Sequence, residues 1–224
     1  MRNKLRLGIV TVGQTPREDL TENVRHIGNS DVDIVIYGAL DGFTEAEIRN
    51  IALKEGDFVV EAKLANGSSR KIPKRFVSPM IKNCVHRLKS EDVDAIIVAC
   101  GVEFRGLEAD RPIIKPWLLL SRVVSVLLSK GILGVIVPIA EQVAYAKSKW
   151  SRKERCVHIE VASPWSKKEL DRAARKIRDA NVDLIVLDGY GYGKSIKEKV
   201  RKVTGKPVLA PSTLAVSLVR ELFG

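Results

Sequence analysis

The feature that most constrains the fold is an internal repeat. Leu7–Thr11 (LGIVT) matches Leu133–Val137 (LGVIV), and Val93–Cys100 (VDAIIVAC) matches Val182–Gly189 (VDLIVLDG). After the second match, each half continues with a polar, glycine-containing loop, a short strand that begins at a proline, and an apolar helix. A chain repeated in this way is expected to form two similar structural units.

Short β-branched runs alternate with amphipathic stretches of helical length, which is typical of βαβ units with parallel sheets. We expect strands near 5–11, 32–37, 94–99 and 112–114, and again near 132–137, 157–162, 183–188 and 207–210. Helices are expected near 16–28, 77–90, 116–129, 139–149, 167–180, 192–203 and 212–223. The sequence therefore predicts an α/β fold with a first half at 1–115 and a second at 116–224, whose last helix packs back on the first half.

The first half carries an extra element. Two strand-like runs, Phe58–Leu64 and Ser69–Ile72, flank an Asn-Gly pair, Asn66-Gly67. Asn-Gly between such runs is a hairpin signal. We predict a β-hairpin insertion at about 58–73, followed by a helix that begins after Ser78-Pro79.

Composition excludes several classes of protein. Of the 224 residues, 45% are hydrophobic, enough for a core, yet no apolar run reaches the length of about 18 residues that spans a membrane. The basic start, Met1–Arg6, leads into strand-like alternation and not a signal-peptide core. The three cysteines form no CxxC pair and the histidines are scattered, so we expect a reducing, cytoplasmic compartment, no metal and no disulfide.

The formal net charge is +11. Such a balance fits either nucleic acid or a small anionic ligand. The basic runs, such as Lys147–Arg155, read as helix faces and loops with acidic residues interspersed, and no aromatic-plus-basic RNA motif occurs. We expect a small anionic ligand; nucleic acid is the weaker interpretation. A homodimer is the default expectation.

Ligands of open parallel sheets bind outside the carboxyl ends of the strands. Gly13–Arg17 follows the first expected strand, with Thr15 as a helix N-cap and Pro16 at the first helical position. Free N–H groups there, beside Arg17, could seat an anion. The alternative is a capped helix with an exposed Arg17. The only two glutamines, Gln14 and Gln142, follow equivalent strands of the two halves, which favours the site.

Cys100 ends an apolar strand and precedes Gly101. A thiol in this place is either a small buried hydrophobe or a nucleophile or base at the strand's carboxyl end. The repeat aligns Cys100 with Gly189, so the second half offers no thiol at the matching point. Cys84 and Cys156 lack this context and are interpreted as structural.

Other strand ends offer further candidates. Asp188 is either an acid or base or the cap of the following turn, and Glu103 serves the site or caps the next helix. The run Gly189–Gly193 lacks the spacing of a phosphate-binding fingerprint.

Taken together, several segments resemble the AroM family. They are Gly8–Arg17 (GIVTVGQTPR), Gly38–Gly42 (GALDG), Cys100–Phe104, Val137-Pro138 with Gln142, Trp150, Ala162–Pro164 and Leu187-Asp188. The resemblance covers nearly the whole chain. It implies an aspartate/glutamate racemase-like fold of two pseudo-symmetric flavodoxin-like halves, with a site in the cleft between them.

The resemblance also implies a chemistry. In racemases of that superfamily one cysteine from each half works on opposite faces of the substrate's α-carbon. Cys100 stands where the first cysteine would be, whereas Asp188-Gly189 stands where relatives usually show Asp-Cys. A single cysteine suits a one-base reaction such as decarboxylation, isomerisation or enolisation next to a carboxylate.

We therefore expect a cofactor-independent racemase-, isomerase- or decarboxylase-like enzyme acting on a small carboxylate. The alternative is a non-catalytic binding or regulatory protein on the same fold. The expected catalytic residues are Cys100 and Asp188. The expected binding residues are Thr11, Gln14, Thr15, Arg17, Gly101, Glu103, Gln142, Gly189, Tyr190, Ser212 and Thr213.

Overall fold

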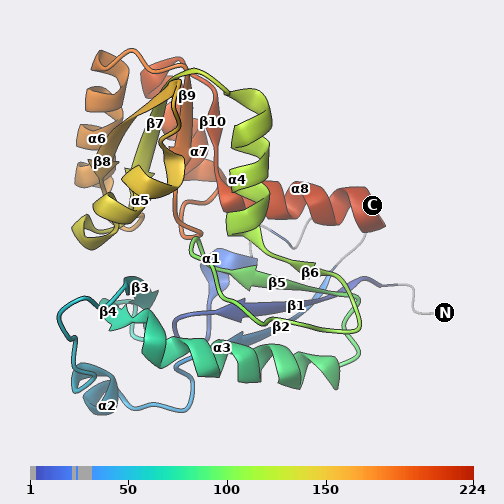
Figure 1. Cartoon of the computed structure of the whole chain (residues 1–224). Helices are drawn as coiled ribbons and strands as arrows, with labels where there is room; N and C mark the ends of the chain where they lie inside the picture. The colour runs from blue at the N-terminus through green and yellow to red at the C-terminus, as the bar shows by residue number, and fades with distance from the viewer. Residues whose placement is uncertain (1–3, 22–23, 25–31) are drawn as a thin grey trace. The chain divides into compact units, whose positions relative to one another are not determined.

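The computed structural model describes residues 4–21, 24 and 32–224. The chain divides into two compact units. The first comprises Met1–Lys115 together with Ala215–Gly224, and the second comprises Pro116–Leu214. Each unit is built on its own four-stranded parallel sheet, and the two are described in turn (Figure 1).

The sheet of the first unit has the strand order β2-β1-β5-β6. Its strands are β1 (Arg6–Thr11), β2 (Asp33–Gly38), β5 (Ala95–Ala99) and β6 (Ile113–Ile114). The long helix α3 (Lys74–Lys89) packs on β1 and β2. Gly8 allows the closest approach, because a Cβ added there would lie 2.8 Å from the Leu88 side chain.

The predicted hairpin insertion is confirmed. It consists of β3 (Val59–Lys63) and β4 (Ser69–Pro73), which pair antiparallel. Gly67 in its turn has φ of +83°, a conformation that favours glycine. The short helix α2 (Glu45–Arg49), which the sequence reading missed, begins with a capping box between Thr44 and Glu47.

Two predicted helix starts are wrong. Helix α3 begins at Lys74, and Pro79 lies inside it, where the Ser78 hydroxyl donates to the Lys74 carbonyl. The proline lacks an N–H and so costs this helix one hydrogen bond, while Val77 and Ile81 on either side of it are fully buried. Helix α1 (Glu18–Thr21) begins after a cis Thr15–Pro16 bond, so Pro16 is not its first residue. Residues 22–23 and 25–28 of the helix expected at 16–28 lie outside the described residues.

The sheet of the second unit has the order β10-β9-β7-β8. Its strands are β7 (Gly131–Val137), β8 (Arg155–Val161), β9 (Leu184–Leu187) and β10 (Val208–Leu209). Counted along each unit, both sheets place their parallel strands in the order second, first, third, fourth. The register is repeated as well, since Leu7 pairs with Ala95 and Leu133 pairs with Leu184. The internal repeat is thus a repeat of topology and of register.

Helices cover both faces of this second sheet. They are α4 (Pro116–Leu127), α5 (Val143–Trp150) after a 3₁₀ turn at Ala140–Gln142, α6 (Lys167–Asp179), α7 (Lys194–Thr204) and the first turn of α8 (Pro211–Phe223). Leu133, Val135 and Val137 pack with α4 and α5, while Ile136 packs with α6 and α7. This alternation along one strand places a core on each face of the sheet.

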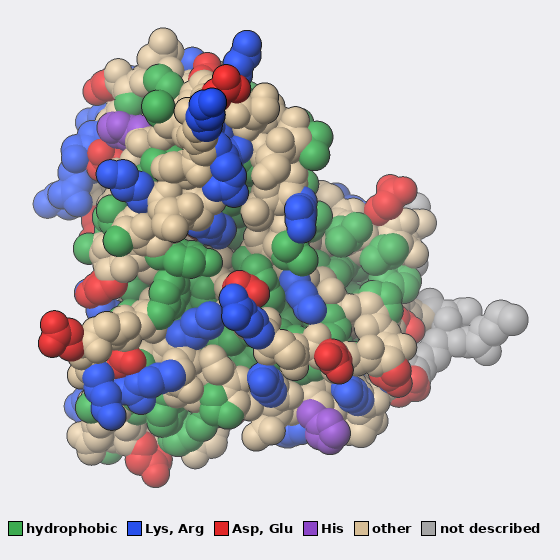
Figure 2. Space-filling view, viewed as in Figure 1, with side chains coloured by type: hydrophobic (Ala, Val, Ile, Leu, Met, Phe, Trp, Pro, Cys, Tyr) green, Lys and Arg blue, Asp and Glu red, His purple; other side chains and the backbone are tan. Residues whose placement is uncertain are grey.

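Two observations concern the surface. Among the described residues, no helix is long and apolar enough to cross a membrane. In the face shown in Figure 2, lysine and arginine side chains are spread among acidic ones and form no single continuous basic field. This distribution agrees with the interpretation of the basic runs as solvated surface.

Candidate functional site

The carboxyl end of the first sheet brings Cys100 close to the loop after β1. Thr11, the last residue of β1, pairs with Ala99, and Cys100 is the next residue along β5. The Cys100 N–H donates to the Val98 carbonyl at 2.7 Å, so the chain turns sharply at the thiol. Cys100 is 6% exposed and forms no disulfide. A reduced thiol therefore stands at the strand end where ligands of such sheets bind.

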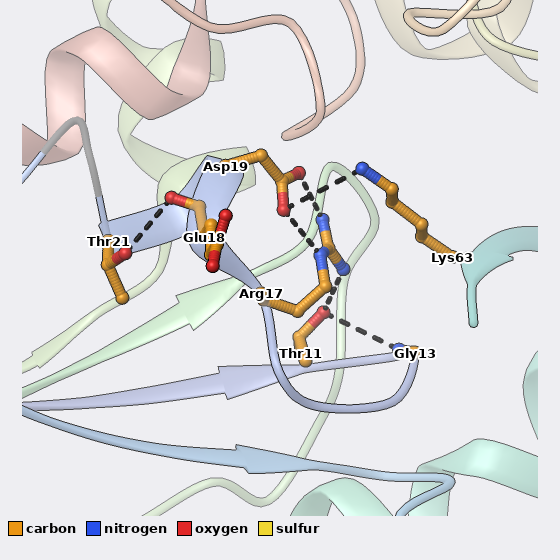
Figure 3. A network of polar contacts seen from close by, with 7 residues as sticks. All are labelled: Thr11, Gly13, Arg17, Glu18, Asp19, Thr21 and Lys63. Carbon is orange, nitrogen blue, oxygen red and sulfur yellow. Dashed lines mark hydrogen bonds and ion pairs between the residues drawn. The ribbon is translucent and has the colours of Figure 1, made fainter. Parts of the chain in front are cut away.

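Arg17 is buried at the same edge and forms the centre of a polar network (Figure 3). Its Nε and Nη2 donate to the two carboxylate oxygens of Asp19, both at 2.8 Å, and its Nη1 donates to the Thr11 hydroxyl at 2.9 Å. The Lys63 ammonium lies 4.0 Å from Asp19. The alternative interpretation predicted an exposed Arg17, and this prediction is wrong. Arg17 is buried, and its guanidinium forms a bidentate ion pair with Asp19.

The Asp19 carboxyl has a lowered pKa. Burial alone would raise this pKa, but the hydrogen bonds and positive charge of Arg17, with the charge of Lys63, outweigh burial. The anion seat expected next to Arg17 is thus occupied by a carboxylate of the chain itself. A four-residue helix α1 offers no N-terminal seat in its place.

The Gln14 side chain connects the loop after β1 to the segment around GALDG and to the hairpin by hydrogen bonds. Its amide nitrogen donates to the carbonyls of Leu40 and Phe43, at 3.1 and 2.8 Å, and its amide oxygen accepts from the Ala65 N–H at 3.2 Å. The side chain expected to hold an anion therefore already uses its donors and acceptor on the backbone of the GALDG loop and of the hairpin.

Asp41, which sequence reasoning did not single out, makes the equivalent connection from the GALDG loop. Its carboxylate accepts from the Thr15 N–H at 2.6 Å and from the Gly38 N–H at 2.7 Å. The signal was present in the motif, since a carboxylate inside a glycine-bounded loop commonly accepts from nearby backbone N–H groups. Thr15 itself is partly exposed.

The remaining candidates of the first unit follow Cys100. Gly101 is buried beside it, whereas Glu103 is exposed and lies 3.4 Å from Arg105. The alternative that Glu103 caps a helix is wrong, because the chain runs through a loop to β6 before the next helix begins.

The second unit places a buried charge at the matching strand end. Asp188, directly after β9, is 5% exposed and accepts from the Lys149 ammonium at 2.7 Å and from the Trp150 indole N–H at 2.6 Å, one on each carboxylate oxygen. The carboxylate is held by α5, so it does not cap the turn that follows it. Lys149 was missed because it reads in sequence as one more residue of a basic run.

Gly189 occupies the position equivalent to Cys100. Its N–H donates to the Leu187 carbonyl at 2.9 Å, which is the same turn that Cys100 makes on Val98. A Cβ at Gly189 would lie 2.9 Å from the ring of Tyr192. That ring is fully buried and its hydroxyl donates to the Ala162 carbonyl. Tyr192 thus fills the space into which a second thiol would project.

Four further candidates carry a hydroxyl or an amide. The Ser212 hydroxyl donates to the Tyr192 carbonyl at 2.7 Å, and the Thr213 hydroxyl donates to the Ala210 carbonyl at 3.1 Å. Thr213 also accepts from the Lys197 ammonium at 3.3 Å. Gln142 is buried in the 3₁₀ turn after β7, and Tyr190 is partly exposed in the loop after β9.

Lys197 is a third residue that sequence reasoning missed. Burial lowers the pKa of its ammonium, and the nearby charge of Arg201 adds to that effect. Burial also raises the pKa of the Cys84 thiol to about 11, whereas Cys156 is exposed on β8. Within the described part of the chain, no group of three or more histidine, cysteine or acidic side chains could hold a metal ion.

Comparison with known families gives a match over almost the whole chain. The family model described as AroM protein matches residues 7–223. The chain belongs to the AroM family. No functionally curated protein matches the sequence significantly.

Solved structures show which fold this AroM protein has. Allantoin racemase from Pseudomonas fluorescens has a TM-score of 0.60 at 20% identity, covering 97% of this chain and 90% of its own. Glutamate racemase RacE1 from Bacillus anthracis has a TM-score of 0.61 at 14% identity, covering 99% of this chain and 82% of the racemase. Maleate cis-trans isomerase from Nocardia farcinica has a TM-score of 0.60 at 14% identity, covering 98% of this chain and 93% of the isomerase. That structure is of a cysteine-to-serine mutant with a covalently bound succinylcysteine intermediate. The predicted aspartate/glutamate racemase-like fold is confirmed.

Proposed function

We propose that this AroM protein is a cofactor-independent enzyme in which the Cys100 thiolate acts as base or nucleophile on a small carboxylate. The observation that carries the proposal is the position of Cys100 itself. It is a reduced thiol placed by a sharp turn at the carboxyl end of a central parallel strand, next in register to Thr11 and the Arg17 network.

The proposed chemistry follows from the presence of a thiol at Cys100 and its absence at the equivalent position of the second unit, Gly189. A thiolate that removes a proton from a carbon next to a carboxylate leaves an enolate-like anion, which must be reprotonated. Because Gly189 provides no second thiol, we propose that the Cys100 thiol itself returns the proton. This favours one-face proton exchange, or isomerisation in which the proton returns at another carbon, over two-base racemisation. In a decarboxylation, loss of CO₂ leaves the same kind of anion, and the thiol supplies the proton that replaces the lost carboxylate.

The relatives of the same fold support a thiol-dependent reaction on a carboxylate. The named glutamate racemase acts on an amino acid, and the maleate isomerase structure contains succinate joined to a cysteine. Both substrates are small carboxylates. We carry this class to the present chain as part of the proposal, together with a cytoplasmic location.

The roles of the surrounding residues are assigned by their contacts. Thr11, Gln14 and Arg17 hold the loop after β1 in place through the hydrogen bonds given above, so we propose them as positioning residues. Thr15 and Gly101 offer groups at the same strand ends and are proposed to face the ligand. In this assignment Asp188 is not the proton acceptor, because both of its oxygens already accept strong hydrogen bonds.

The test is solvent deuterium exchange. The protein is incubated in D₂O with amino acids, dicarboxylates and hydroxy acids, and loss of the α-proton signal is followed by NMR. We expect exchange with at least one carboxylate, its disappearance in Cys100→Ala, and its persistence in Cys156→Ala, the matched control at an exposed thiol. Equal exchange in Cys100→Ala would refute the proposed role of the thiol.

A second candidate function is ligand binding without turnover. The observation that favours it is the packing of Tyr192 in the place of a second thiol, because the two-cysteine machinery is absent from this sequence. If carboxylates raise the melting temperature but none exchanges or is converted, binding without turnover is the better account.

A further inference from the structure

We propose that Lys149, held by Asp188 and Trp150, forms a binding site for a ligand carboxylate at the carboxyl end of the second sheet. This is a statement about binding by residues 116–214, and it does not depend on Cys100 acting as a base.

The first argument is the way the lysine is held. Its side chain is 11% exposed and its ammonium donates to Asp188 at 2.7 Å, while the Trp150 ring lies 4.5 Å from the same nitrogen. The carboxylate and the aromatic face together stabilise the charged form of a group that burial would otherwise penalise. Asp188 is itself fixed from its other side by the Trp150 indole N–H. The ammonium is therefore held between a carboxylate and an aromatic face.

The second argument is the number of donors that remain. An ammonium group has three N–H donors. Among the described residues, Lys149 Nζ donates one hydrogen bond, which goes to Asp188. Two donors of a nearly buried cation are left for acceptor oxygens, and a carboxylate supplies two such oxygens. A purely structural ion pair does not require the second and third donors to be kept available.

The third argument is location. Asp188 directly follows β9, and β10 is the neighbouring strand, with Leu209 paired to Val186. The start of α8 after β10 is therefore about one strand spacing, roughly 5 Å, from the end of β9. There Lys197 donates to Thr213. Lys149 and Asp188 thus lie at the strand end where ligands of open parallel sheets bind.

The test is direct binding of malonate and succinate to the full-length protein by calorimetry, with succinamide as the uncharged probe. We expect Lys149→Met to weaken dicarboxylate binding at least tenfold and Lys149→Arg to weaken it less. Lys147→Met is the matched control, two residues away and exposed, and should bind like the wild type.

A measurement on the unaltered protein guards against a misfolded variant. The indole N–H of Trp150 shares Asp188 with Lys149, so succinate should shift its NMR signal more than those of Trp117 and Trp165. Unchanged affinity in folded Lys149→Met, binding of succinamide as tight as that of succinate, or an unshifted Trp150 signal at saturation would overturn the inference. None of these results would touch the role proposed for Cys100. If neither malonate nor succinate binds the wild type, this inference is overturned, while the exchange experiment still decides the role of Cys100 separately.

Discussion

Gly13 in the motif GIVTVGQTPR is expected to be far more sensitive to substitution than Gly42 in GALDG. A Cβ at Gly13 would lie 2.0 Å from the Lys63 carbonyl oxygen, whereas real Cβ contacts essentially never fall below 3.0 Å. The clash is with backbone, so no side-chain rotation relieves it, and the hairpin must move by about 1 Å or more. A Cβ at Gly42 would have no atom within 4 Å, and the φ angle of Gly42 is not in the positive range.

The magnitude follows from what the movement breaks. Overpacking of this kind costs about 1–3 kcal/mol. The Gln14 N–H, which donates to the Lys63 carbonyl at 3.0 Å, loses a hydrogen bond worth about 1 kcal/mol. We therefore expect Gly13→Ala to lower the free energy of unfolding by about 2–4 kcal/mol, whereas Gly42→Ala should change it by less than about 1 kcal/mol.

The assay is urea unfolding followed by far-UV circular dichroism, with both variants measured beside the wild type. A loss of about 2–4 kcal/mol corresponds to a fall in melting temperature of roughly 10 °C in a chain of this size. If Gly13→Ala stays within about 1 kcal/mol of the wild type, or if Gly42→Ala is equally costly, the packing account of these motifs is wrong.

Three further predictions concern buried or paired charges and thiols. Arg155 is buried and donates to carbonyls at the ends of α4 and α5, so Arg155→Met should cost about 2–4 kcal/mol in urea unfolding while exposed Arg178→Met costs under about 1. Because burial raises the pKa of Cys84 to about 11, iodoacetamide at pH 8 should alkylate exposed Cys156 first by peptide mass spectrometry; faster labelling of Cys84 would contradict its burial. The lowered pKa of Asp19 means that its ion pair stabilises the fold above the ordinary carboxyl pKa and is lost as pH falls through the folded value. Asp19→Asn should therefore flatten the decline of melting temperature between about pH 5 and 2, and an unchanged decline would show that the pair contributes little.

The sheets could be predicted because their sequence signal is strong and local. Buried parallel strands such as β5 and β9 are continuous apolar runs, and they recur at equivalent places in the two halves. The hairpin was marked by Asn66-Gly67. By contrast, α2 is a short polar helix whose only signal is its Thr44 capping box, and five residues leave little periodicity to read.

The predicted helix starts were wrong where the prediction relied on a proline. Ser78-Pro79 and Thr15-Pro16 both resemble the beginning of a helix, yet one pair lies inside α3 and the other precedes α1 in a cis conformation. Local preference favours proline in a first turn, but packing against the sheet decides where the helix begins.

The candidate site divides along similar lines. Strand ends could be located, so Cys100, Gly189 and Asp188 were found from order along the chain. The partners of site residues could not, since Asp41 and Lys149 become neighbours of Thr15 and Asp188 only through long-range folding. The sequence did not indicate that Arg17 and Gln14 use their polar groups within the protein.

The central claim is that a single thiol, Cys100, performs the proposed chemistry. The equivalent position in the second unit is Gly189, where the Tyr192 ring leaves little room for a cysteine side chain. The most direct test is the stereochemistry of exchange in D₂O, measured on one enantiomer of whichever chiral carboxylate exchanges. The account predicts that deuterium enters with retention of configuration in the wild type and that exchange ceases in Cys100→Ala. Racemisation at the rate of exchange, or exchange that survives loss of the thiol, would contradict it.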